Sequence, residues 1–271
     1  MNWQSIKAIM FKDIKEIGRN VQFWLPTAVV PLLLVVVIPL IINLVVSKLP
    51  ASSMNNSSWD QIFKHMSAAQ PGLSDMTRRQ GMIYIFANYL FAPFFLIIPL
   101  MVSTIIAANS FAGERERKTI ESLLYTPVPD LELLLGKVLA AFVPSVVVSW
   151  LAFLAFVITV DATSFPLFGR LLLPTVCWVL LLAFLAPAVS FLGLGITVLI
   201  SARVRGFQEA QQIAGVLVLP ILFLIFGQAL GLFVLDARLI LAIAVILAFL
   251  DYLLVRWGTR TFSRERVITQ L

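Results

Sequence analysis

The chain has 271 residues, of which 60% are hydrophobic and 13% charged, and its mean hydropathy is +0.98. Because a soluble domain is usually about 45–50% apolar and about 25% charged, this composition excludes an ordinary soluble protein and indicates an integral membrane protein. The net charge of +6 comes from basic residues beside apolar segments, so it predicts contact with membrane lipid and no nucleic-acid partner.

Residues 1–22 have the pattern of an amphipathic helix. Apolar side chains recur there at three- and four-residue spacing, at Trp3, Ile6, Met10, Ile14 and Ile17. Charged side chains occupy the opposite face, at Lys12, Lys15, Glu16 and Arg19. The pattern predicts a helix that lies in the inner membrane interface, although a soluble helix packed on a partner would have the same pattern.

Six apolar segments are long enough to cross a bilayer, which takes about 20 helical residues. We place them at residues 23–46, 82–110, 133–160, 168–200, 213–235 and 239–255. They show no period-two alternation, so they predict helices rather than the strands of a barrel. Prolines inside them are the expected kink points, at Pro31, Pro39, Pro93, Pro99, Pro144, Pro174, Pro187 and Pro220.

Lysine and arginine are unevenly distributed over the connections between these segments. Fourteen of the 20 fall in residues 1–22, 111–137, 201–212 and 256–271, and six fall in the 47–81 loop, at Arg170 and at Arg238. The positive-inside rule then predicts a multi-pass protein of the cell (plasma) membrane with both termini cytoplasmic. In the outer 47–81 loop, Ser58 and Gln61 have the spacing of a capping box, which predicts a short helix.

We find no catalytic, metal-binding or nucleotide-binding motif in these 271 residues. A Walker A loop requires G-x-x-x-x-G-K-[ST], whereas LELLLGKVL has the Gly136–Lys137 pair without the first glycine or the hydroxyl. The single histidine, His65, has no second ligand nearby, and the single cysteine, Cys177, lies in an apolar run.

Ionisable residues are scarce inside the predicted spans, where Asp161, Asp236 and Asp251 fall near the ends. A charge at the bilayer centre costs at least about 2.5–3.5 kcal/mol, and an ion-coupled carrier usually keeps a few such charges. This scarcity disfavours a self-contained channel or secondary carrier, which stays an alternative together with a non-transporting scaffold.

Neutral polar residues inside the spans are expected mainly to form hydrogen bonds between helices. They are Asn88, Ser103, Thr104, Ser190, Thr197 and Gln228. Asn88 and Gln228 are also candidates for lining a pore.

Residues 113–137, GERERKTIESLLYTPVPDLELLLGK, place a charged segment between two spans. Residues 114–118 predict a solvated elbow, after which Thr119 can cap a short helix that Pro127 and Pro129 end. Ile120, Leu123 and Leu124 would form its apolar face. Such a helix suits a partner's groove, but an amphipathic loop on the inner leaflet fits the pattern as well.

Two stretches of the chain resemble the permease subunits of ABC-2 type transporters, which are ATP-driven exporters. They are ERERKTIESLLYTPV followed by ELLLGK, and GLGITVLISARVRGFQEAQQIAGVLVLP at residues 193–220. The resemblance implies an all-α integral membrane protein of the ABC-2, or type V exporter-like, fold. It would have six transmembrane helices, an N-terminal interfacial helix, and a short coupling helix in a cytoplasmic region at 111–132. Many members carry a glycine where this chain has Lys118.

The resemblance also implies a role, partners and site residues. The chain would be a permease that exports an unidentified substrate, with no catalytic residue or metal ligand of its own, because a separate ATP-binding cassette subunit binds ATP and Mg. A second copy of the chain or a similar permease would complete the assembly. Contact with the ATPase subunit is implied for Glu116, Thr119, Glu121, Ser122, Leu123, Leu124, Arg203, Arg205 and Gln208.

Overall fold

The structure is a computed structural model that describes residues 2–18, 21–48, 76–119, 128–204 and 206–261. Over that part the chain forms helices and no strands. The α-helices are α1 (Trp3–Gly18), α2 (Val21–Leu32), α3 (Ile38–Lys48), α5 (Arg78–Ile85), α6 (Phe91–Phe95), α7 (Ile97–Ala108), α8 (Glu114–Glu116), α10 (Asp130–Phe168), α11 (Val176–Leu180), α12 (Ala186–Ser201), α13 (Phe207–Gly215), α14 (Val218–Ala229) and α15 (Ala237–Thr261). Four π-helical segments join them, η1 (Leu33–Val37), η4 (Phe86–Leu90), η5 (Asn109–Gly113) and η6 (Leu181–Leu185).

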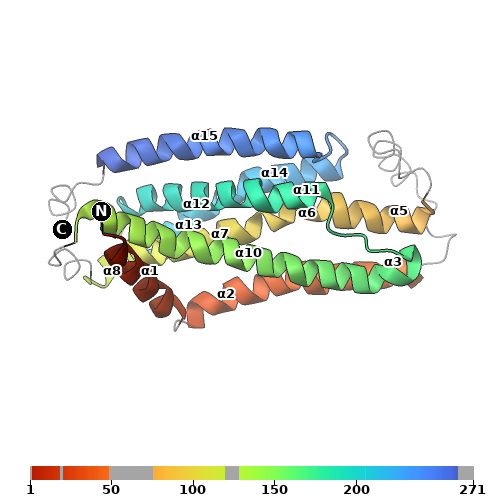
Figure 1. The fold of residues 1–271 in the computed structure, drawn as a ribbon, viewed down its shortest axis with the longest axis horizontal. Coiled ribbons are helices and arrows are strands. Elements are labelled where there is room, and N and C mark those ends of the chain that lie inside the picture. The colour runs from red at the N-terminus through yellow and green to blue at the C-terminus, as the bar shows by residue number, and fades with distance from the viewer. Residues whose placement is uncertain (1, 19–20, 49–75, 120–127, 205, 262–271) are drawn as a thin grey trace.

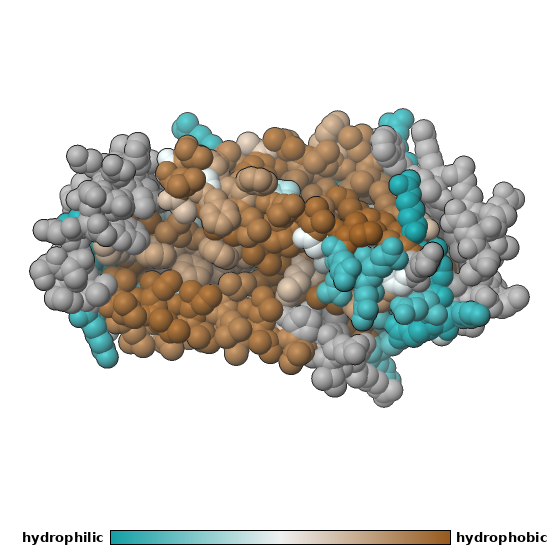
Figure 2. Space-filling view, turned by 180° about the vertical axis from the view of Figure 1, so that it is seen from behind, coloured by the Kyte–Doolittle hydropathy of each residue, from teal (hydrophilic) through white to brown (hydrophobic). Residues whose placement is uncertain are grey.

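Within the described residues, six helical stretches are long and apolar enough to cross a membrane, which confirms the predicted number. They are Thr27–Lys48, Arg78–Glu116, Asp130–Phe168, Val176–Ser201, Phe207–Ala229 and Ala237–Arg256. They run side by side in one elongated bundle, with α1 packed across one end and the last turn of α15 at that same end (Figure 1). The flank of the bundle is apolar, and hydrophilic side chains gather at its ends (Figure 2).

The second span forms the centre of the bundle. Its most apolar stretch is 78% buried, against 17–44% for the other five spans. Its helix α7 packs against α12, where Gly193 permits the close approach, since a Cβ there would lie 2.5 Å from Leu100 Cδ1. An aromatic cluster fills the adjoining core, and in it the ring centroids of Phe95 and Trp178 are 4.8 Å apart.

In the described part of the chain, three of the four π-helical segments end two or three residues before a proline. η1 precedes Pro39, η4 precedes Pro93 and η6 precedes Pro187. A proline has no N–H, and its ring crowds the preceding turn of an α-helix. A π-turn widens the backbone at that point, so the wider turns follow the prolines that the sequence marks as kink points.

The boundary predicted between the third and fourth spans was wrong. α10 continues to Phe168 and ends on Gly169, which has a left-handed φ of 64°; an extended segment follows before α11 begins. Asp161, expected near a helix end, lies inside α10 and is buried. Its Oδ1 accepts hydrogen bonds from the backbone N–H groups of Leu172 and Leu173, at 2.9 and 3.2 Å, so the returning segment neutralises the cost of burying it.

The other two acidic residues that were expected near the ends of spans, Asp236 and Asp251, lie in different environments. Asp236 caps α15, because its Oδ1 accepts from the N–H of Leu239 at 2.9 Å. Asp251 lies inside α15, where its Oδ1 is buried and makes no hydrogen bond with the described residues.

The second span begins on a capping box that we did not predict. The Thr77 hydroxyl accepts from the N–H of Gln80, and the Gln80 side chain accepts from the N–H of Thr77. The box predicted at Ser58 and Gln61 lies outside the described residues, as does His65.

The neutral polar residues inside the spans form fewer contacts between helices than expected. Ser190 bonds to Ser145 across α12 and α10, and Asn88 accepts from the Thr175 hydroxyl. By contrast, Ser103, Thr104 and Thr197 donate to carbonyls of their own helices. Gln228 is buried, and neither amide atom has a partner among the described residues.

Candidate functional site

Helix α1 is held against the bundle by its packing on α10. Ile6 and Ile17 are buried, and Ile17 joins a core cluster with residues of α7 and α12. Gly136 permits the contact, because a Cβ there would lie 2.8 Å from Ile9 Cβ and 3.2 Å from Ile6 O. The face of α1 expected to meet the membrane therefore lies mostly on protein, with only Trp3 of that face exposed.

Lys137, the residue after Gly136, is 3% exposed, and its ammonium group pairs with acidic side chains from two other elements. Its Nζ lies 2.6 Å from Glu114 Oε2, donates to Ser110 O at 2.7 Å, and lies 3.7 Å from Asp13 Oδ2. Glu114 and Asp13 are also buried. The prediction that residue 114 is solvated was therefore wrong, because its carboxylate points into the protein and pairs with side chains of α10 and α1.

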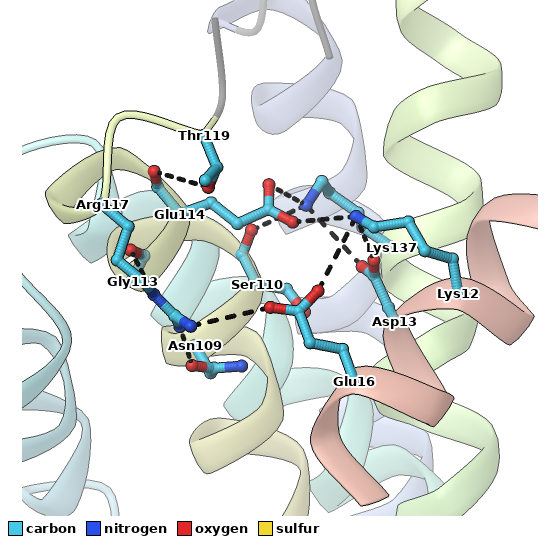
Figure 3. A network of polar contacts seen from close by, with 10 residues as sticks. All are labelled: Lys12, Asp13, Glu16, Asn109, Ser110, Gly113, Glu114, Arg117, Thr119 and Lys137. Carbon is cyan, nitrogen blue, oxygen red and sulfur yellow. Dashed lines mark hydrogen bonds and ion pairs between the residues drawn. The ribbon is translucent and has the colours of Figure 1, made fainter. Parts of the chain in front are cut away.

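Three further side chains extend this cluster toward solvent (Figure 3). Lys12 Nζ lies 3.0 Å from Asp13 Oδ1 and 3.3 Å from Glu114 Oε1, and Arg117 lies 3.6 Å from Glu16. Desolvation lowers the pKa of Lys12, but the Asp13 and Glu114 carboxylates outweigh it and raise the pKa above 10.5. We call Lys12, Asp13, Glu16, Glu114, Arg117 and Lys137 the charged junction.

The charged junction contains three acids and three bases, so its formal charges cancel. The carboxylates of Asp13, Glu16 and Glu114 lie within 4.8 Å of one another, but the ammonium groups of Lys12 and Lys137 share the space between them. The arrangement connects α1, the end of the second span and the start of the third. Its paired charges hold these three elements together.

Arg115 connects the same region to the end of the fourth span. Its guanidinium donates to three main-chain oxygens at the C-terminal end of α12, those of Ser201, Ala202 and Val204. A helix leaves carbonyl groups unpaired at its C-terminus and concentrates negative potential there. Arg115, from another part of the chain, supplies both the hydrogen-bond donors for these carbonyl groups and a positive charge.

Glu116 does the converse for the next helix. Its Oε2 accepts from the N–H of Phe207, the first residue of α13, at 3.0 Å. A carboxylate is stabilised there because helix N-termini present free N–H groups and positive potential. Gly206 leaves room for it, since a Cβ at that position would lie 2.6 Å from Glu116 Oε2.

Lys118 ends this region in an unusual backbone conformation. Its φ is +58°, the only positive φ at a non-glycine residue among those described. Thr119 N bonds to Glu114 O and Lys118 N to Arg115 O, both at 3.0 Å, which is the Schellman pattern of a helix end. That pattern needs a left-handed residue, a conformation that glycine adopts without the steric cost a side chain brings.

The predicted coupling residues lie on both sides of this region. Thr119 donates to Glu114 O, and Arg203 and Gln208 are exposed next to the Arg115 and Glu116 contacts. Glu121, Ser122, Leu123, Leu124 and Arg205 lie outside the described residues. Sequence reasoning missed Asp13 and Lys137; the available signal was that Asp13 falls between Met10 and Ile17 on an otherwise apolar helix face.

The two candidate pore residues lie away from the charged junction. Asn88 borders a cavity of about 150 Å³ near the opposite end of the bundle, lined also by Tyr84, Tyr89, Thr175, Val176 and Cys177. Gln228 is buried in α14. The residues that line the cavity are uncharged and include both polar and apolar side chains, and the structure brings neither Asn88 nor Gln228 to the charged junction.

The sequence was compared with known proteins. Residues 7–255 match the model of a family described as ABC-2 family transporter protein. Comparison with curated proteins found no match, and comparison with solved structures found none either.

Proposed function

Because the chain belongs to the ABC-2 family of transporter proteins, we propose that it is the permease of an ATP-driven exporter, driven through residues 114–119. A separate ATPase subunit would bind ATP and Mg, because permeases of this family work with ATPase subunits. The substrate would pass between two permease domains, from this chain and a second copy or a similar chain.

The observation that carries this proposal concerns residues 114–119, which we call the elbow. The elbow belongs to one of the two connections implied to meet the ATPase subunit, and it contacts the other. Arg115 holds the end of α12 and Glu116 holds the start of α13, so the elbow and the 201–206 connection are joined. Glu114 joins the elbow to Lys137 of α10 and to Lys12 of α1. A push on the elbow would therefore reach four helices, α10 and α1 through ion pairs and α12 and α13 through hydrogen bonds between charged side chains and backbone groups.

Burial makes the Glu114–Lys137 contact suitable for transmitting force. The Glu114–Lys137 pair is almost free of solvent, so its attraction is screened much less than that of a surface pair. Breaking it would leave an unpaired buried charge, and the two elements therefore move together. In the proposed cycle, closure of the ATPase subunits displaces both elbows and shifts the spans between inward-open and outward-open arrangements.

The test is capture of the ATPase partner by paired variants. We expect Leu123→Asp with Leu124→Asp to abolish co-purification of a chain with Walker A and Walker B motifs, while membrane insertion is unchanged. Leu131→Asp is the control, because Leu131 is an exposed leucine at the start of α10, beyond Pro129, where the predicted short helix has ended.

Two results would refute the proposal. One is normal co-purification of the ATPase with the double aspartate variant. The other is movement of solute by the purified chain alone in liposomes, which would favour a self-contained channel or carrier.

A further inference from the structure

The face of α1 that points away from the bundle carries a regular stripe of aromatic and basic side chains. Trp3, Lys7, Phe11 and Lys15 follow one another at four-residue spacing, which places them along one side of a helix. All four are exposed, Trp3 at 53% and Phe11 at 63%. Lys7 Nζ lies 6.0 Å from the centre of the Trp3 ring, within the range of a cation–π contact. We call these four residues the outer stripe.

The outer stripe carries a net positive charge. The two acids of α1 are taken up by the charged junction, Asp13 by Lys12 and Lys137, and Glu16 by Arg117 and Lys12. Lys7 and Lys15 form no ion pair with any described residue. The helix therefore uses its acids on the protein side and presents its free lysines outward.

The position of α1 restricts what can cover this stripe. α2 begins at Val21, three residues after α1 ends, and the first span begins within it at Thr27. A helix that close to a span lies at the depth of the lipid headgroups. Tryptophan and phenylalanine favour that region, and lysine reaches from it toward phosphate.

We infer that the outer stripe is a binding surface for anionic phospholipid headgroups of the leaflet at the α1 end of the bundle. Trp3 and Phe11 enter the interface, and Lys7 and Lys15 contact the phosphates. This face differs from the one the sequence pattern indicated, because Ile6 and Ile17 are already occupied by α10 and its neighbours. Since α1 also carries Lys12, Asp13 and Glu16, lipid bound outside would restrain the charged junction inside.

The test uses Trp3 as an internal reporter in the full chain. The protein is reconstituted into liposomes that contain either phosphatidylglycerol or phosphatidylcholine brominated near the carbonyl end of the acyl chains, and tryptophan quenching is measured. The difference between wild type and Trp3→Phe isolates the Trp3 signal. We expect brominated phosphatidylglycerol to quench Trp3 at a lower mole fraction than brominated phosphatidylcholine, by about fivefold for each lysine.

Lys7→Gln with Lys15→Gln should bring the two lipids to equal quenching. Neither lysine has an ion-pair partner to lose among the described residues, so this variant should fold, and the unchanged quenching of the other tryptophans would verify its insertion. Lys48→Gln is the control, an exposed lysine at the end of α3, and should keep the preference.

Two outcomes would overturn the inference. If neither lipid quenches Trp3, the stripe faces water or protein; if both quench it equally in the wild type, anionic lipid is not preferred. The measurement needs only the permease in a bilayer, so either outcome leaves the proposed ATPase coupling untouched.

Discussion

Lys137 shows how a single buried cation can hold three elements together. It is the residue shared by α10, the Glu114 carboxylate and the Asp13 carboxylate, and it is removed from solvent. A buried ion pair adds little net stability over an apolar pair of the same shape, but the loss of one partner is costly. The value of Lys137 therefore lies in fixing the arrangement of its neighbours.

We predict that Lys137→Met lowers the free energy of unfolding by about 3 kcal/mol, because Glu114 keeps its charge with only Lys12 nearby. The double variant Lys137→Met, Glu114→Gln should recover most of this loss, since the Glu114 charge is gone and Asp13 keeps Lys12 as its partner. Unfolding in mixed detergent micelles measures both. A double variant less stable than the single one would contradict the reasoning.

Lys118 gives a second prediction at the residue scale. Its left-handed φ of +58° costs an L-residue about 1–2 kcal/mol, and glycine avoids that cost. Lys118→Gly should raise the free energy of unfolding by about 1 kcal/mol, whereas Lys118→Val, with its branched Cβ, should lower it. The midpoints of thermal unfolding in detergent should separate in that order, and a less stable glycine variant would show that Lys118 makes contacts that outweigh the strain.

At this scale the sequence identified the charged residues of the elbow but did not predict which of them are buried. The elbow was identified from its charges, but Glu114 was placed in solvent, because its partners, Lys137 and Lys12, come from distant parts of the chain. Local spacing cannot reveal such pairs. Two features could have shown them: Asp13 on an apolar helix face, and a Gly–Lys pair at the start of a span.

Among the elements, the contact of α1 with α10 depends on one small residue. We predict that Gly136→Ala loosens α1, because the new Cβ would meet Ile9 Cβ at 2.8 Å and either helix must move. Faster amide hydrogen exchange over residues 3–18 would report this loss. Gly215→Ala is the matched control, since a Cβ there meets nothing within 4 Å, and it should leave exchange in α1 unchanged.

The bridge between the elbow and α13 can be tested in the same way. Glu116→Ala removes the cap of α13 and should lower the free energy of unfolding by about 1 kcal/mol. Glu116→Gln keeps an oxygen that can accept from Phe207 N. Gly206→Ala should imitate the loss, because its Cβ would occupy the place of Glu116 Oε2. Amide exchange at the start of α13 should rise for the two alanine variants and not for the glutamine variant. Equal exchange in all three would contradict the cap.

The elements themselves were largely predictable, because an apolar run of more than 20 residues has few folds open to it in lipid. Their ends were less so. The third span extends past Asp161 because a segment that follows in the chain supplies the hydrogen bonds its carboxylate needs, and no helix period encodes that contact. The second span extends into the elbow for the same reason, since Glu114 is neutralised by α10 and α1.

The whole molecule has two ends of different character. One carries α1, the charged junction and the elbow; the other carries the start of α5, the extended segment before α11 and the neutral cavity beside Asn88 (Figure 1). The distribution of lysine and arginine predicts that the first end faces the cytoplasm. The geometry of the bundle agrees with six crossings but is the same for either orientation.

Cys177 provides the measurement that distinguishes the two orientations. It is the only cysteine in the 271 residues, it is half-buried, and it lines the cavity at the end away from the elbow. If both termini are cytoplasmic, a charged thiol reagent that cannot cross the membrane should modify Cys177 in intact cells.

The labelling has a direct control and a clear contrary result. Cys177→Ser should abolish labelling, because no other thiol is present, and it should leave folding intact since the side chain is small and partly exposed. Modification only in inverted vesicles would place the cavity and the N-terminal end of α11 on the cytoplasmic side. The elbow would then face away from any cytoplasmic ATPase, and the proposed coupling would fail with the orientation, because force from ATP hydrolysis can enter only where the nucleotide is.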